Sequence, residues 1–190
     1  MRKQGVTRAQ LRHPWERGFS LIELLIVVAI ILIIAAIAIP NLVKAKMAAN
    51  ETSAAAQVRL ISTIEMSYAN SCGGYAMTLA KVGPASPETC DNGMGLVDNS
   101  IGVDGTVYKS GFKFIYTPGP GGTLTSNGVT VGVDFVYGGE PIAWNSTGRK
   151  SYCSTPEPSV VRGSSGSALV VVPTTIDACS GSGAQFAPVN

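Results

Sequence analysis

A single carboxylate, that of Glu23, lies inside a long apolar run near the N-terminus. From Phe19 to Ile39 the only polar residues are Ser20 and Glu23. A carboxylate within a membrane segment costs roughly 2.5–3.5 kcal/mol on insertion scales, so such a residue marks a functional position by default. The chemistry open to it there is charge pairing, because an opposite charge offsets the cost of burying an ion.

Thiol chemistry is confined to the part of the chain after this run, which contains all four cysteines. If that part lies outside the cytoplasm, an even number of cysteines predicts two disulfides. Four cysteines allow three pairings, and we expect the sequential one, because it closes the shortest loops: Cys72–Cys90 and Cys153–Cys179. There is no Cys-x-x-Cys, and the single histidine, His13, precedes the apolar run. We therefore expect neither a metal site nor another cofactor.

Other candidate chemistry is weak. Asp91, Asp98 and Asp104 bring acids into one loop, but their order does not match an EF-hand, and Asx–Gly turns explain them more simply. After residue 18 the chain has no histidine, no phosphate-binding loop and no Gly-x-Ser-x-Gly pattern, and its serines lack a visible base. We expect no catalytic residue and no enzymatic activity.

The element that positions Glu23 is the apolar run itself. As a helix it covers roughly 30 Å, the thickness of a bilayer core, and only a helix satisfies the backbone of a single span. A basic leader precedes it, with one acid, Glu16, against five bases: Arg2, Lys3, Arg8, Arg12 and Arg17. This bias predicts that the N-terminus stays cytoplasmic and that the C-terminal part crosses the membrane. Without the leader, nine basic and eleven acidic side chains remain, so the basic character does not indicate a nucleic-acid partner.

Helical character continues after the apolar run. Residues 41–70 are rich in good helix formers, and their apolar members recur at helical spacing: Leu42, Ala45, Ala49, Ala56, Leu60, Ile64 and Tyr68, with Val58 and Ile61 beside them. We expect one helix from about Ser20 to Asn70 that Pro40 bends or loosens and that Gly73-Gly74 ends. A long loop, Ser71 to Tyr108, follows.

Strand signals appear after Gly111. The candidates are Phe112–Tyr116, Val129–Tyr137 as one alternating strand, Ile142–Trp144, Lys150–Cys153 and Ala168–Val172. Asn127-Gly128 is a hairpin turn signal between the first two. The fold class is therefore α+β, with one long helix packed on a small antiparallel sheet of about four strands.

The N-terminal motif Gly18-Phe19-Ser20-Leu21-Ile22-Glu23-Leu24-Leu25, after Arg17 and before an apolar run that ends at Ile39-Pro40-Asn41, closely resembles the signal of type IV pilins and type II secretion pseudopilins. The resemblance implies a pilin fold in three parts: a leader peptide at residues 1–18, a transmembrane and filament-core half-helix at 19–40, and an exported domain at 41–190. It also implies that a prepilin peptidase cleaves after Gly18 and N-methylates Phe19.

Three residues are then expected to act in assembly: Phe19, Glu23 and Pro40. Cleavage would create a positively charged amine at Phe19, and Glu23 could pair with the amine of the next subunit or, at i,i+4 spacing, with its own. The resemblance suggests that the helix partly unwinds just before Pro40 in filaments. The alternative is that Pro40 only marks the exit from the membrane.

Three functions fit these residues. The first is a structural subunit of a type IV pilus-like filament, whose partners are the prepilin peptidase, copies of itself and other pilins, the membrane and an inner-membrane assembly platform. The second is a type II secretion pseudopilin, major or minor, acting in export. The third, a monomeric membrane-anchored binding domain, explains neither the Gly18-Phe19 junction nor Glu23. The expected location is the bacterial inner membrane before assembly and the pilus or periplasmic pseudopilus afterwards.

Overall fold

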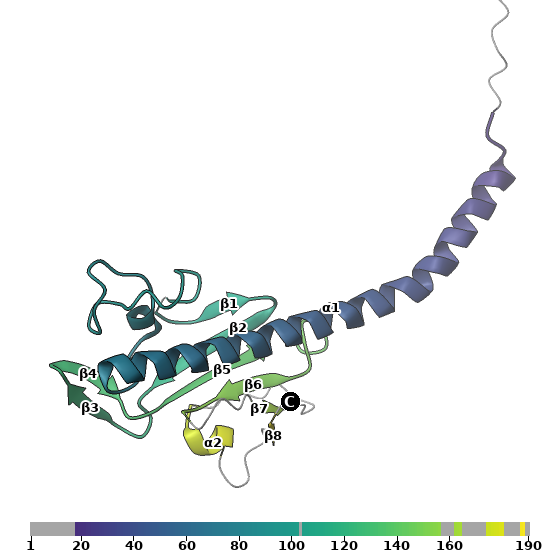
Figure 1. Cartoon of the computed structure of the whole chain (residues 1–190). Coiled ribbons are helices and arrows are strands. Elements are labelled where there is room, and N and C mark those ends of the chain that lie inside the picture. Colours follow the sequence, from purple (N-terminus) through teal and green to yellow (C-terminus); the bar gives the residue numbers. More distant parts are fainter. Residues whose placement is uncertain (1–17, 103, 157–161, 165–173, 181–186, 189–190) are drawn as a thin grey trace, which may run out of the picture. The chain divides into compact units, whose positions relative to one another are not determined.

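The computed structural model describes residues 18–102, 104–156, 162–164, 174–180 and 187–188, and it divides the chain into two compact units, Met1–Asn41 and Leu42–Asn190. The leader Met1–Arg17 and the strand candidate Ala168–Val172 therefore lie outside the described residues. One helix, α1, runs from Leu21 to Cys72 with Pro40 inside it (Figure 1). By length and composition it is the one described helix that could cross a membrane.

In the C-terminal unit, α1 packs on the sheet through a face that differs from the predicted apolar stripe. Leu42, Ala56 and Leu60 are exposed, whereas the buried side chains are those of Ala54, Ala55, Gln57, Val58, Ile61, Ser62, Ile64, Glu65, Tyr68 and Cys72. The stripe was only partly right because this buried face includes polar residues, which a search for apolar periodicity passes over. α1 ends where predicted, and Gly73 follows it at φ 82°, a conformation that glycine adopts without strain.

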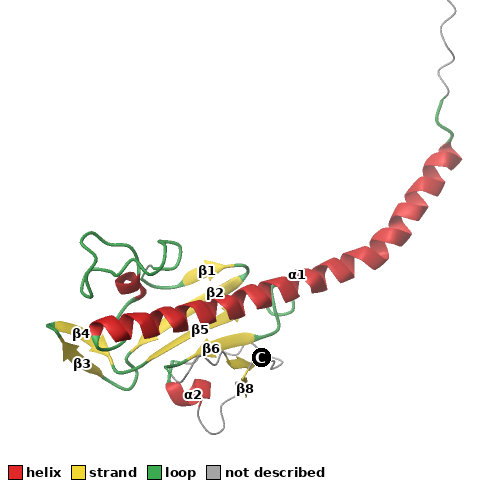
Figure 2. Cartoon of the chain, in the orientation of Figure 1, coloured by secondary structure: helices red, strands yellow, loops and turns green. Residues whose placement is uncertain are grey.

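Among the described residues the sheet has six antiparallel strands in the order β1-β2-β5-β6-β7-β8, two more than predicted (Figure 2). The strands are β1 (Val107–Lys109), β2 (Phe112–Pro118), β5 (Phe135–Pro141), β6 (Ser151–Ser154), β7 (Arg162–Ser164) and β8 (Ala187–Pro188). A separate hairpin pairs β3 (Thr123–Ser126) with β4 (Val129–Gly132). Two short helices complete the described elements, the 3₁₀ helix η1 (Leu79–Val82) and α2 (Ile176–Ser180).

The predicted single strand Val129–Tyr137 is wrong, because it is two strands, β4 and β5, in different sheets. Asp134 separates them. Its Oδ1 accepts the N–H of Gly121 at 2.9 Å, and its carbonyl oxygen accepts the N–H of Gly119 at 2.9 Å. These bonds attach the chain to the turn before β3 instead of to a neighbouring strand. Asn127-Gly128 does form a hairpin turn, but it joins β4 to β3, a strand that the sequence did not predict.

The strand predicted at Ile142–Trp144 is also wrong. β5 ends at Pro141, and the chain then turns, with the Ser146 N–H donating to Ala143 O at 3.1 Å and the Asn145 N–H to Gly148 O at 3.1 Å. Local turn bonds use the groups that a strand would offer to a neighbour. Trp144 is half-buried and lies outside the core.

Two cores lie on opposite faces of the sheet. Alternate residues of β5, Phe135 and Tyr137, face the main core under α1, while Val136 between them packs with Cys153, Cys179 and Ile176. The two disulfides are Cys72–Cys90, which joins the last turn of α1 to the following loop, and Cys153–Cys179, which holds α2 on the second face. This is the sequential pairing.

Gly139 tests the packing of the main core. It pairs with Phe114 across β5 and β2, and a Cβ at residue 139 would lie 2.5 Å from Phe114 Cε1. Overpacking a close-packed core typically costs about 1–3 kcal/mol, so Gly139→Ala should lower the free energy of unfolding by that amount in denaturant titrations. Adding Phe114→Leu, which shortens the opposing side chain, should make the Gly139→Ala step smaller. A neutral Gly139→Ala would contradict the tight packing.

Candidate functional site

The predicted processing junction is open in the structure. Gly18, Phe19 and Ser20 precede the first residue of α1 and are exposed, and Phe19 is 75% exposed. A Cβ built on Gly18 would meet nothing within 4 Å. A peptidase needs an accessible backbone of this kind at the bond that it cleaves, so the geometry is compatible with hydrolysis between Gly18 and Phe19.

The Glu23 carboxylate turns back over the start of α1. Its Oε2 accepts the backbone N–H of Ser20 at 3.1 Å, while Ser20 O accepts the N–H of Leu24 at 3.2 Å. Ser20 and Glu23 are three residues apart, the spacing of a capping box, in which the glutamate satisfies the amide at the helix start. The sequence analysis missed this role, although the Ser-x-x-Glu pattern before an apolar run is its signature.

The cap places the carboxylate of Glu23 at Ser20, which is the residue next to the predicted new amine of Phe19. In the uncleaved chain the Glu23 carboxylate accepts its hydrogen bond from the N–H of Ser20, the residue after Phe19. A carboxylate has two oxygens and can accept further hydrogen bonds, so bonding to Ser20 leaves capacity for an amine. The N-terminal unit therefore presents an acid at its end, above an exposed apolar helix.

The other side chains of this half-helix are apolar and exposed. Leu21 is 87% exposed and Leu25 68%, and every residue from 21 to 34 is exposed. An apolar surface of this extent requires lipid or another protein to cover it. Pro40, the third predicted assembly residue, lies inside α1, so it does not end the helix here.

Two of the acids in the loop after α1, Asp91 and Asp98, contact different partners. Lys81 Nζ lies 2.8 Å from Asp91 Oδ1, and Asp98 Oδ1 accepts the N–H of Ser100 at 2.8 Å. The hydrogen bonds from Ser100 lower the pKa of the Asp98 carboxyl. Within the described ranges no group of three or more His, Cys, Asp or Glu side chains could hold a metal ion.

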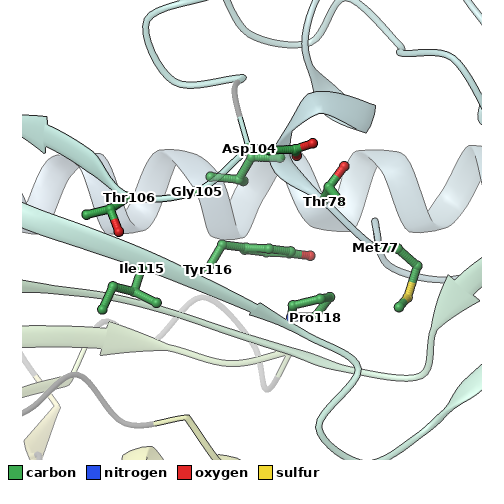
Figure 3. A pocket seen from close by; sticks show the side chains of 9 residues that line it. Met77, Thr78, Asp104, Gly105, Thr106, Ile115, Tyr116 and Pro118 are labelled. Carbon is green, nitrogen blue, oxygen red and sulfur yellow. The ribbon is translucent and has the colours of Figure 1, made fainter.

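A pocket beside the start of β1 is lined mainly by apolar and hydroxyl side chains. Met77, Thr78, Thr106, Ile115 and Tyr116 line it, with Asp104 at its rim (Figure 3). Asp104 is its one charged lining residue, and the Tyr116 hydroxyl is already engaged, donating to Ala76 O at 2.6 Å. These groups include no nucleophile with an adjacent base.

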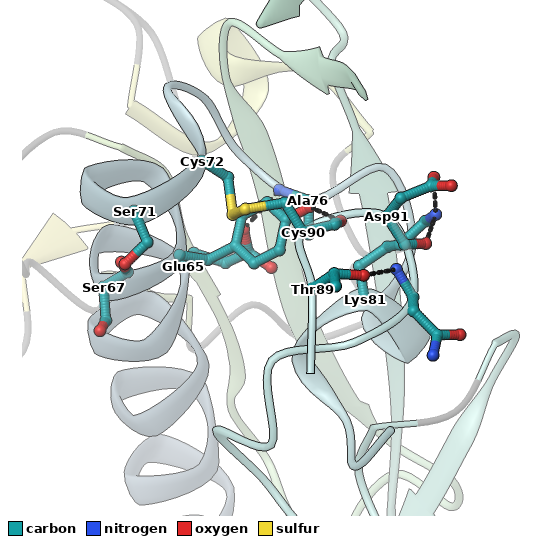
Figure 4. Close-up of a disulfide and its surroundings, with 11 residues drawn as sticks. Glu65, Ser67, Ser71, Cys72, Ala76, Lys81, Thr89, Cys90 and Asp91 are labelled. Atoms are coloured by element: carbon teal, nitrogen blue, oxygen red, sulfur yellow. Dashed lines mark hydrogen bonds and ion pairs between the residues drawn. A yellow bond between two sulfur atoms is a disulfide. The ribbon is translucent and has the colours of Figure 1, made fainter. Parts of the chain in front are cut away.

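Glu65 is a buried ionisable group that the sequence analysis missed. Glu65 lies on the buried face of α1 near the Cys72–Cys90 disulfide and is fully buried. Its Oε2 accepts the Ala76 N–H at 2.9 Å (Figure 4). Its Oε1 has no hydrogen-bond partner among the described residues. Burial raises the pKa of Glu65 to about 8, against smaller opposing effects of the Ala76 N–H and the Tyr116 hydroxyl.

Comparison with known proteins agrees with these features. The family model of the prokaryotic N-terminal methylation motif matches residues 16–39. The type IV major pilin protein PilA of Myxococcus xanthus is 39% identical over 71 residues, which are 37% of this chain and 32% of that protein. The type IV wide pilus major component PilA4 of Thermus thermophilus is 64% identical over 36 residues, 19% of this chain and 28% of that protein.

The matched segments thus cover less than a third of each relative's own length. No solved structure matches the chain. The methylation motif and the two pilin relatives thus show that the N-terminal part of the chain is similar to type IV pilins.

Proposed function

We propose that the chain is a structural, non-enzymatic subunit of a type IV pilus-like filament. The observation that carries this proposal is the methylation motif at residues 16–39, which contains both the Gly18-Phe19 junction and Glu23. A prepilin peptidase removes residues 1–18 and methylates the amine of Phe19. The apolar half of α1 then holds the subunit in the inner membrane until an assembly platform adds it to the filament.

The geometry supports a filament rather than a simple anchor. The exposed half-helix is long enough for either use, but an anchor needs neither an accessible junction at Gly18 nor an acid at Glu23. In a filament the same apolar surface would pack against copies of itself, which removes it from water. The two relatives are named as pilus components, and this favours a pilus over a secretion pseudopilus.

Deleting the gene in its native host should remove a class of surface filaments visible by electron microscopy, because a structural subunit is required for every filament. A plasmid copy should restore them, and the filaments sheared from the cells should contain the chain as a repeating component. Unchanged filaments in the deletion strain, or sheared filaments that lack the chain, would exclude this function.

A further inference from the structure

Five exposed bases gather around the lower part of α1 in the C-terminal unit. They are Lys44, Lys46, Lys109, Arg149 and Lys150, called here the basic collar. Two of them follow Pro40 within six residues, and the other three come from the end of β1 and from the segment before β6. These bases are far apart in the sequence, and contacts of their segments with α1 bring them close together.

On the first side of the collar, Glu51 contacts two of the base-bearing residues. Its Oε1 accepts the Arg149 N–H at 2.7 Å, and its Oε2 lies 3.7 Å from Lys150 Nζ. Lys44 precedes Glu51 by seven residues, which is two helical turns, so both lie on the same face of α1. Lys44, Arg149 and Lys150 therefore form one column of positive charge along this face.

The second side is built on Ser53. Its Oγ lies 3.0 Å from Ser110 Oγ, next to Lys109, whose Nζ lies 3.4 Å from Gln57 Oε1. Lys46 precedes Ser53 by seven residues and shares its face. Because Lys46 is two residues from Lys44, the two columns are about 200° apart around the helix, and the collar surrounds it.

Few acids neutralise the collar. Glu51 is the one acidic residue within 42–53, 107–111 and 147–150, and it already contacts Arg149 and Lys150. Lys109 acts on Asp98, helping to lower the pKa of that carboxyl after the larger effect of Ser100. Five bases facing two acids leave a net positive surface.

The position of the collar in the sequence, directly after the apolar run, indicates what kind of molecule it binds. Bases next to a membrane span normally lie on the cytoplasmic side, yet these follow the span on the side expected to cross. Positive side chains close to a bilayer surface attract anionic lipids. Lys44 and Lys46 lie within about two helical turns of Ile39, where the apolar run ends, so they reach the headgroup level when the run is in lipid.

We propose that the basic collar binds the phosphate groups of anionic phospholipids at the outer surface of the inner membrane. The bound lipids hold the unassembled subunit against the bilayer and are released when it enters the filament. The proposal rests on the membrane-stored stage of the proposed function, but lipid binding is measured on the isolated subunit and therefore independently of filaments.

The test uses the mature full chain in a mild detergent, titrated with phosphatidylglycerol or phosphatidylcholine, with bound lipid counted by native mass spectrometry. Wild type should prefer phosphatidylglycerol. The variant Lys44→Gln/Lys46→Gln/Arg149→Gln, which spares the contacts of Lys109 and Lys150, should bind it at least tenfold more weakly, since each base near the surface contributes about fivefold. Lys81→Gln/Lys113→Gln, which removes two bases outside the collar, should bind as wild type does.

Four outcomes would overturn the proposal. Equal binding of both lipids would remove the anionic preference, and displacement of the lipid by inorganic phosphate would indicate a site for free phosphate. A collar variant that keeps phosphatidylglycerol but fails to form filaments would assign the collar to acidic groups of a second copy. If the triple variant does not fold, raising NaCl from about 0.05 M to about 0.5 M should still weaken phosphatidylglycerol binding by wild type, because salt screens exposed charges. Salt-independent binding contradicts the collar.

Discussion

Glu23→Ala should abolish filaments while leaving processing intact. In a filament, the acid is expected to lie in the apolar core beside the positively charged amine of Phe19. Removing one partner of a buried ion pair typically costs roughly 3–5 kcal/mol, which is more than a hundredfold in each subunit addition. Electron microscopy of sheared filaments measures assembly, and intact-mass analysis measures removal of residues 1–18 and methylation of Phe19.

Glu23→Gln separates the two roles of this side chain. The carboxylate accepts the Ser20 N–H, and a glutamine oxygen can accept the same bond, so this variant keeps the helix cap and loses only the charge. If the ion pair drives assembly, both variants stop filament formation. Normal filaments from Glu23→Gln would show that the cap is sufficient, and a subunit that retains residues 1–18 would contradict the processing step.

The second large effect is a loss of stability as pH rises, caused by Glu65. The pKa of this carboxyl is about 8 in the folded chain against 4.5 in the unfolded chain, because burial penalises the charged form. Between these values the folded state binds more protons at Glu65, so the contribution of this group to the free energy of unfolding is fully present below pH 4.5, falls as pH rises towards 8 and then levels off. The total loss is a few kcal/mol.

Glu65→Gln should remove this pH dependence. Its amide is neutral at every pH and can still accept the Ala76 N–H, so the variant should be more stable than wild type above about pH 6. Unfolding of the mature chain can be followed by the fluorescence of Trp144, since the other tryptophan, Trp15, belongs to the leader. The mature chain also lacks histidine, which would otherwise titrate in this range.

Glu88→Gln is the matched control, because it removes one exposed carboxylate from the same unit. It should keep the decline in stability between pH 5 and 8 that Glu65→Gln loses. A wild-type stability that rises over this range, or a Glu65→Gln variant that declines in parallel with wild type, would show that Glu65 is not buried in its neutral form.

Several features of the chain could be predicted from the sequence because they depend only on residues that are neighbours along the chain. The apolar run, the leader charges and the Gly18-Phe19 junction lie within one continuous stretch, and their function depends on order and spacing rather than on distant partners. The end of α1 at Gly73-Gly74 and the turn at Asn127-Gly128 follow from the backbone freedom of glycine. The assembly residues Phe19, Glu23 and Pro40 remain predictions.

Features that depend on distant contacts were decided only by the tertiary structure. Val129–Tyr137 alternates as a strand should, but the bonds of Asp134 to the turn at 119–122 divide it between two sheets. Glu65 resembles a solvent-facing helix residue until the segment after α1 places the Ala76 N–H against it. The basic collar likewise forms because Glu51 and Ser53 contact base-bearing segments that lie 98 and 57 residues away in the sequence.

The sequence thus determined the N-terminal half of α1, a continuous apolar run in which a helix satisfies the backbone groups locally, without distant partners. The tertiary structure decided the C-terminal unit, where burial, register and pKa depend on which groups approach from elsewhere in the chain. Periodicity in a sequence reports the average environment of a face. It does not report a single buried acid such as Glu65 or a single strand-breaking bond such as that of Asp134.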